Sequence, residues 1–256
     1  MLVHNVRVYN YLDGQQIRIY KRPICKCEEI WETELTKKKE KKKKKKGVKD
    51  ENRSDSVSKN RTIQKIYEVT RSNMWEYFIT LTFDPKKVNS FDYAEVSKVL
   101  SKWLNHLKER YAPDLKYIIV PELHKSGRYH FHGLIADIGN LKLVDSGHKT
   151  PSGDVIYNIE NYKLGFTTAT KIKDASRVSS YITKYITKEL CATTSNKKRY
   201  WCSRNLNEVK IDDYCLAPDE IEQIIFDLSE NISYAKTIDV PILDQSVRIF
   251  EIKDSV

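Results

Sequence analysis

The feature that most constrains this fold is an alternating segment, Arg128-Tyr129-His130-Phe131-His132-Gly133-Leu134-Ile135. Successive side chains of a strand point to opposite faces, so His130 and His132 share one face and Phe131 points into the core. Two imidazoles on one rigid face are suited to binding a metal ion. The segment therefore predicts a strand with one face in a hydrophobic core and a pair of metal ligands on the other.

A carboxylate is expected to complete the predicted metal site. Residues 116–121 form an apolar strand pattern that is followed directly by Glu122. If this strand pairs with the histidine strand through a turn at Gly127, Glu122 lies beside the two histidines. His124 is an alternative third ligand. Open coordination suits Mg²⁺, and the imidazoles shift the preference toward Mn²⁺. We therefore expect Mg²⁺ or Mn²⁺ as cofactor.

A second segment repeats four residues, as Tyr181-Ile182-Thr183-Lys184-Tyr185-Ile186-Thr187-Lys188. We expect a helix over 175–190, on which a spacing of four places both tyrosines on one stripe at the border of an apolar face. Lys184 and Lys188 each follow a tyrosine by three residues, so the two Tyr-Lys units look equivalent. Tyr181 and Tyr185 are candidate nucleophiles with lysine partners. The alternative is a pair of ordinary packing tyrosines, in a chain that has 16.

One reaction suits a metal site beside paired tyrosines and lysines: a tyrosine attacks a metal-polarised phosphodiester. The phenol pKa is ordinarily about 10, and a nearby ammonium group or metal favours the phenolate. The metal also neutralises the phosphate as the nucleophile arrives.

The remaining pattern indicates a mixed fold. Expected strands are a hairpin over 3–24 around Asp13-Gly14, then 77–83, 116–121, 128–136, 155–160, 165–170 and two short strands within 234–250. Expected helices are 61–73, 92–111, 175–190 and 219–229, with a surface loop over 139–154. This order predicts an α+β fold: a central antiparallel sheet with helices packed on one face, plus an N-terminal β-hairpin.

The formal net charge is +10, which fits a polyanionic partner, with nucleic acid before membrane. Much of the excess lies in residues 37–46, which hold nine lysines and Glu40; without them the chain is near neutral, so overall charge supports DNA binding only weakly. This run predicts a solvated, disordered linker. We divide the chain into an N-terminal hairpin (1–32), a lysine-rich linker (33–60), a central domain (61–205) and a C-terminal α/β extension (206–256).

The cysteines and the apolar segments bear on the cellular compartment. The five cysteines are an odd number without a paired Cys-x-x-Cys motif, so we interpret them as reduced thiols. We find no N-terminal signal pattern and no long apolar run. We therefore expect a cytoplasmic protein with no membrane partner.

Three motifs in order resemble the HUH endonucleases, and more closely the rolling-circle replication initiators of small single-stranded DNA phages and plasmids. Residues 78–83 (Phe-Ile-Thr-Leu-Thr-Phe) resemble the first motif, a structural strand. Glu122 with residues 128–133 is similar to the metal motif, and residues 181–188 are similar to the third motif in its two-tyrosine form. The resemblance covers about residues 60–205.

The resemblance implies an RNA-recognition-like antiparallel sheet and a nick at a single-stranded or hairpin replication origin. It further implies a 5′-phosphotyrosine and a free 3′-hydroxyl that primes a polymerase, in a bacterial host cell. Two tyrosines imply alternating cleavage and rejoining. The chain has no Walker A motif, so we expect no fused helicase and a need for a host helicase as well as a host polymerase.

Three other functions stay open. A relaxase or a transposase would use the same chemistry. An iron(II) oxygenase also binds metal through two histidines and a carboxylate, but its motif usually spaces a histidine two residues from Asp or Glu, and it has no role for Tyr-Lys repeats. A non-catalytic, basic DNA-binding regulator would tolerate phenylalanine at both tyrosines.

Overall fold

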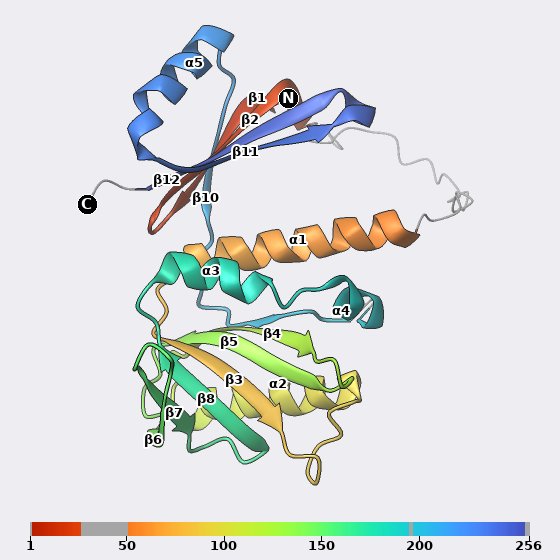
Figure 1. The fold of residues 1–256 in the computed structure, drawn as a ribbon, viewed down its shortest axis with the longest axis vertical. Helices are drawn as coiled ribbons and strands as arrows, with labels where there is room; N and C mark the ends of the chain where they lie inside the picture. The colour runs from red at the N-terminus through yellow and green to blue at the C-terminus, as the bar shows by residue number, and fades with distance from the viewer. Residues whose placement is uncertain (1, 27–50, 195–196, 254–256) are drawn as a thin grey trace, which may run out of the picture. The chain divides into compact units, whose positions relative to one another are not determined.

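The computed structural model describes residues 2–26, 51–194 and 197–253, drawn in colour in Figure 1. The chain divides into two compact units. Unit 1 joins Met1–Lys49 with Val209–Val256, and unit 2 is Asp50–Glu208. Among the described helices, none is long and apolar enough to span a membrane.

Unit 2 is built on a seven-stranded sheet of order β6-β7-β8-β3-β5-β4-β9. Its strands are β3 (Tyr77–Phe83), β4 (Lys116–Leu123), β5 (Tyr129–Ala136), β6 (Leu143–Lys149), β7 (Val155–Ile159), β8 (Gly165–Lys171) and β9 (Trp201–Cys202). Every recorded pairing in it is antiparallel. The predicted α+β class and antiparallel sheet are confirmed.

Four α-helices accompany this sheet. They are α1 (Glu51–Arg71), α2 (Tyr93–Arg110), α3 (Ala175–Thr183) and α4 (Lys188–Thr193). Helix α2 matches its prediction because Asp92 caps it: the Asp92 carboxylate accepts a hydrogen bond from the amide of Ala94 at 2.8 Å. The predicted apolar stripe of α2 is buried against the core.

The helices cover both faces of the sheet, whereas the sequence pattern predicts cover on one face (Figure 1). Helix α2 covers the face that carries Phe131, through Tyr93 and its contact with Trp201. The opposite face also needs cover, because Ile118 and Leu134 lie on it and are fully buried. Helices α1, α3 and α4 lie on this second side.

Two local predictions in unit 2 are wrong. Residues 139–154 contain strand β6, which pairs with β7. Most of its side chains are exposed, so the strand lacks the apolar alternation by which it would be recognised. Helix α1 begins at Glu51, so the last part of the predicted linker is helical. The lysine run lies outside the described residues.

Unit 1 is a second antiparallel sheet, of order β10-β1-β2-β12-β11, with helix α5. Its elements are β1 (Leu2–Tyr11), β2 (Gly14–Lys26), β10 (Lys210–Tyr214), α5 (Pro218–Asp227), η1 (Ser229–Asn231), β11 (Ile232–Val240), η2 (Pro241–Leu243) and β12 (Gln245–Lys253). The predicted N-terminal hairpin is confirmed. It is not a separate module, because β2 pairs with β12 and β1 with β10. The hairpin and the C-terminal extension thus share one sheet, and Ile17 and Ile252 share its apolar core.

Candidate catalytic site

The two histidines of β5 lie on the face of the sheet away from α2 and are held by the neighbouring strand. The hydroxyl of Thr80 lies 3.1 Å from Nδ1 of His132, and the hydroxyl of Thr82 lies 3.1 Å from Nδ1 of His130. These contacts fix both rings on a rigid strand. Nδ1 is engaged in each ring, so Nε2 is the atom that each can direct at a ligand.

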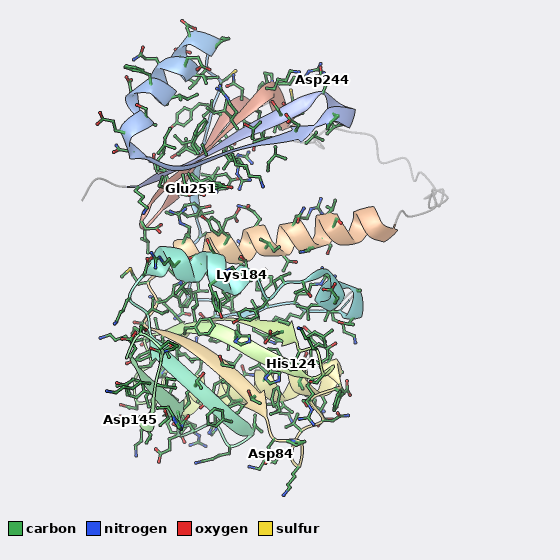
Figure 2. The ribbon with its side chains drawn as sticks, in the orientation of Figure 1. Asp84, His124, Asp145, Lys184, Asp244 and Glu251 are labelled. Atoms are coloured by element: carbon green, nitrogen blue, oxygen red, sulfur yellow. The ribbon has the colours of Figure 1, made fainter. Side chains whose placement is uncertain are left out.

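Strand β4 brings a carboxylate to the same place. Glu122 lies directly opposite His130 in the β4–β5 register, and its Oε2 is 2.7 Å from Nε2 of His132. The His124 ring, at the end of β4 (Figure 2), lies 5.5 Å from the His130 ring between centroids. Glu122 therefore reaches His132, while His124 stays beside His130. In the described part of the chain, no three His, Cys, Asp or Glu side chains form a ready-made metal-binding cluster.

Burial keeps both imidazoles neutral near pH 7. Loss of solvation lowers the pKa of His132, against the opposing hydrogen bond from Glu122, and lowers the pKa of His130 as well. A neutral imidazole is the form that can donate a lone pair to a metal ion. The electrostatics of the site thus suit coordination by these two side chains.

The two tyrosines of the repeat cover the histidines. The Tyr185 ring stacks on the His132 ring, with centroids 3.8 Å apart and planes 9° apart. The Tyr185 hydroxyl donates a hydrogen bond to the Tyr181 hydroxyl at 3.0 Å, and the Tyr181 ring meets the edge of Phe78 at 5.5 Å. Both phenol oxygens thus lie together above the histidine face.

The tyrosines differ in environment, although the repeat predicts equivalent units. Tyr181 is 47% exposed, and the Lys184 ammonium lies 5.4 Å from its ring centroid. Tyr185 is half-buried, and burial, followed by the hydrogen bond to Tyr181, raises its pKa well above the ordinary value. Tyr185 therefore keeps its proton more firmly than an exposed phenol.

The predicted single helix over 175–190 is wrong, because it breaks between the two tyrosines. Asp174 caps α3 as expected, but α3 ends at Thr183. The Thr187 hydroxyl accepts a hydrogen bond from the amide of Leu190 at 3.1 Å and starts α4. Threonine competes for backbone hydrogen bonds and favours caps over helix interiors, which the period-four pattern conceals. Lys188 is the first residue of α4, and Lys184 is the C-cap of α3 at the site (Figure 2).

Sequence reasoning missed three side chains of the site: Phe78, Thr80 and Thr82. It treated residues 77–83 as a buried structural strand. The signal was present, because alternate residues of this strand are hydroxyl-bearing while Ile79, Leu81 and Phe83 are apolar. The structure places the threonines against the histidine rings and Phe78 against His132 and Tyr181.

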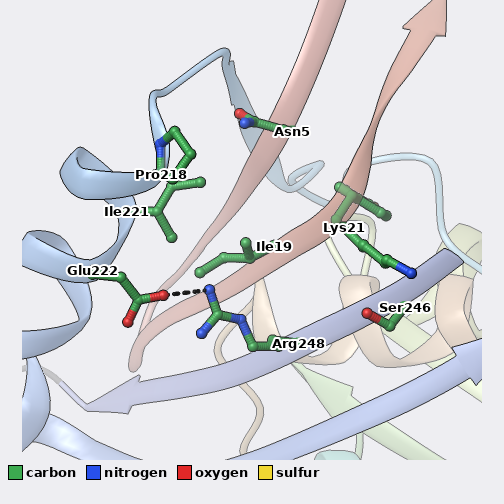
Figure 3. Close-up of a pocket in the computed structure, with 9 residues that line it drawn as sticks. Asn5, Ile19, Lys21, Pro218, Ile221, Glu222, Ser246 and Arg248 are labelled. Atoms are coloured by element: carbon green, nitrogen blue, oxygen red, sulfur yellow. Dashed lines mark hydrogen bonds and ion pairs between the residues drawn. The ribbon is translucent and has the colours of Figure 1, made fainter.

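Unit 1 holds a pocket of about 290 Å³ between α5 and its sheet (Figure 3). Its charged lining includes an ion pair, in which Arg248 lies 3.0 Å from Glu222. Ile19 and Ile221 supply apolar walls. This chemistry differs from the histidine, carboxylate and phenol groups gathered in unit 2, so the candidate catalytic site is in unit 2.

Comparison with known proteins bears on the same region. Searches of curated proteins and of solved structures find no significant match. A family model does match, over residues 76–190, a span that includes β3, β4, β5 and α3 and therefore every residue of the site described above. The matched model is that of the replication-associated protein ORF2 family, and this match supports a replication initiator.

Proposed function

We propose that unit 2 is a metal-dependent DNA-nicking endonuclease and strand transferase that initiates rolling-circle replication at a single-stranded or hairpin origin. The observation that carries the proposal is the stack of Tyr185 on His132, which holds two phenol oxygens over a histidine–carboxylate cluster. The family match to replication-associated proteins supports the choice of DNA as substrate.

The residues present fit a divalent metal, Mg²⁺ or Mn²⁺. His130, His132 and Glu122 supply two nitrogens and a carboxylate, and the 2.7 Å between Oε2 of Glu122 and Nε2 of His132 brings these donors within reach of a shared ligand. When bound, such an ion polarises the phosphodiester and offsets its negative charge. Thr80 and Thr82 hold the imidazoles in the orientation that binding requires.

We assign Tyr181 as the first nucleophile. It is the more exposed phenol, and it accepts the hydrogen bond that Tyr185 donates, which favours the Tyr181 phenolate. The nearby Lys184 ammonium acts in the same direction. Attack joins the tyrosine oxygen to phosphorus and breaks the bond to the 3′-oxygen, which gains a proton as the phenol loses one. The products are a 5′-phosphotyrosine and a free 3′-hydroxyl.

Tyr185 supports this attack as a hydrogen-bond donor and then acts as the second nucleophile. After a round of synthesis it attacks the regenerated origin junction, and the released 3′-end rejoins the strand held on Tyr181. A host polymerase extends the 3′-hydroxyl, and a host helicase opens the duplex. Lys188 completes the second Tyr-Lys unit in this scheme.

Trapping of a covalent adduct tests the proposal. Purified protein is incubated with Mn²⁺ and a pool of random-sequence single-stranded oligonucleotides labelled at the 3′ end, because the tyrosine retains the 5′-phosphate of the downstream fragment. The wild type is expected to carry label through denaturing electrophoresis, Tyr181→Phe to carry far less, and the double Tyr181→Phe/Tyr185→Phe variant to carry none.

The matched control is Tyr214→Phe in unit 1, because Tyr214 is 46% exposed and thus similar to Tyr181. This variant is expected to form as much adduct as the wild type. Equal labelling of the wild type and the double variant would overturn the proposal. DNA binding by the double variant without any wild-type adduct would point to a non-catalytic regulator.

A further inference from the structure

Phe166 is an exposed aromatic side chain on the catalytic face of the sheet. It lies on β8 directly opposite Thr82 of β3, so the two side chains share a face. Thr82 contacts His130, which lies opposite Glu122. One row across four neighbouring strands therefore reads Phe166, Thr82, His130, Glu122. Phe166 occupies the β8 end of the row and is 57% exposed.

The surroundings of Phe166 on this face are polar. Thr168 and Thr170 are its same-face neighbours along β8, opposite Thr80 and Phe78 respectively. A large apolar ring that is more than half exposed gains little from folding, because most of its surface stays in water. Phe166 is thus not accounted for by the core of unit 2.

The position of the ring is rigid, because the start of β8 lies tightly against β3. Gly165 lies opposite Phe83, and a Cβ on Gly165 would come within 2.6 Å of the amide nitrogen of Asp84. Only glycine permits this approach of the two backbones. Phe166 is therefore presented by a strand in the interior of the sheet order rather than by a loop.

A cation lies close to this end of β8. The Lys87 ammonium donates a hydrogen bond to the carbonyl of Lys163 at 2.9 Å, and its side chain is 53% exposed. Surfaces that bind single-stranded nucleic acid without base readout combine cations for the phosphates with exposed aromatic rings for the bases. Both components are present beside Gly165.

We propose that Phe166 stacks on a nucleobase of the DNA strand next to the phosphate at the His130 end of the site. Two interstrand spacings put its backbone about 10 Å from that of His130 across the sheet, within the reach of a single nucleotide. The stacked base sets the register of the strand and thus which phosphate the tyrosine meets. This inference rests on the proposed nicking function.

Its test uses binding rather than chemistry. Fluorescence anisotropy of a short fluorescein-labelled oligothymidylate is measured with the full chain in excess chelator, where nicking is absent. Phe166→Ala is expected to weaken binding by about 5- to 100-fold, the loss of one base–aromatic stack. Phe166→Leu should weaken it similarly, because leucine keeps apolar bulk without a π-face, while Phe166→Trp should restore wild-type affinity.

The matched control is Phe226→Ala on α5, because Phe226 is 75% exposed. It should bind as the wild type does. A Phe166→Ala protein with wild-type affinity, or a Phe166→Leu protein that binds as well as Phe166→Trp, would overturn the inference. Loss of affinity in Phe166→Ala with no covalent adduct in the wild type would support this inference and reject the nicking function, so the two failures are distinguishable.

Discussion

The two faces of the seven-stranded sheet differ sharply although they alternate residue by residue along β5. Phe131 is fully buried and meets the edges of Phe83 and Trp201 at 5.8 and 5.3 Å. Its neighbours His130 and His132 face the other way, toward hydroxyl, carboxylate and phenol groups. One strand thus serves a packed core on one side and a polar site on the other.

The difference shows how a site gains rigidity from a core. The α2 face consists of interlocking apolar side chains, whose total volume matters more than any one chemical group. On the histidine face each ring depends on a specific partner, such as Thr82 for His130. Substitutions on the α2 face should therefore affect stability, and those on the histidine face should affect activity.

The largest expected effect is on activity, from the double variant His130→Ala/His132→Ala. Loss of both imidazoles removes metal assistance worth several kcal/mol, so nicking should fall by roughly 1,000-fold or more. The melting temperature should change little, because both side chains are polar and face away from the main core. Single-turnover cleavage at saturating Mn²⁺ and thermal melting measure the two effects. Cleavage at the wild-type rate would refute the proposed metal site.

On the opposite face, Phe131→Ala should lower the free energy of unfolding by about 3–5 kcal/mol, because it leaves a cavity in a packed aromatic cluster. Urea denaturation measures this loss. Cleavage per folded molecule should be retained well below the melting temperature. A loss below about 1 kcal/mol would show that the face is not the stability-determining side.

A smaller effect is expected for Thr82→Val, which removes the hydroxyl on Nδ1 of His130 and keeps the side-chain volume. Loss of such a supporting hydrogen bond should weaken Mn²⁺ binding by about 10- to 100-fold. Calorimetric titration with Mn²⁺ measures the affinity, and Thr168→Val on β8 of the same face is the matched control. Identical affinities for the two variants would mean that the threonine does not position the ring.

The smallest effect concerns pH in the metal-free protein. The folded-state pKa of His132 is below its ordinary value because the ring is buried. Its contribution to stability is therefore fully present above the unfolded pKa of about 6.5 and is lost as pH falls below that value. Urea denaturation in chelator between neutral and mildly acidic pH should show this decline, and His132→Gln should reduce it. A decline of equal size in His132→Gln would assign it to other groups.

Local sequence patterns determined much of the fold. The alternation of His130, Phe131 and His132, the capped amphipathic helix after Asp92, and the Asp13-Gly14 hairpin all depend on near neighbours, and all three appear in the structure. The placement of Glu122 beside the histidines also followed from a short hairpin register. Such features are predictable because strand and helix periodicity is a property of the local backbone.

Tertiary structure alone decided the rest, because those features join residues that are distant in sequence. The sharing of one sheet by the N-terminal hairpin and β12 is a pairing across most of the chain, on which no local pattern reports. The hydrogen bonds from Thr80 and Thr82 to the histidines required the β3–β5 register. The repeat made Tyr181 and Tyr185 look alike, but burial against His132 and the break of the helix made them different, since a phenol takes its character from what surrounds it.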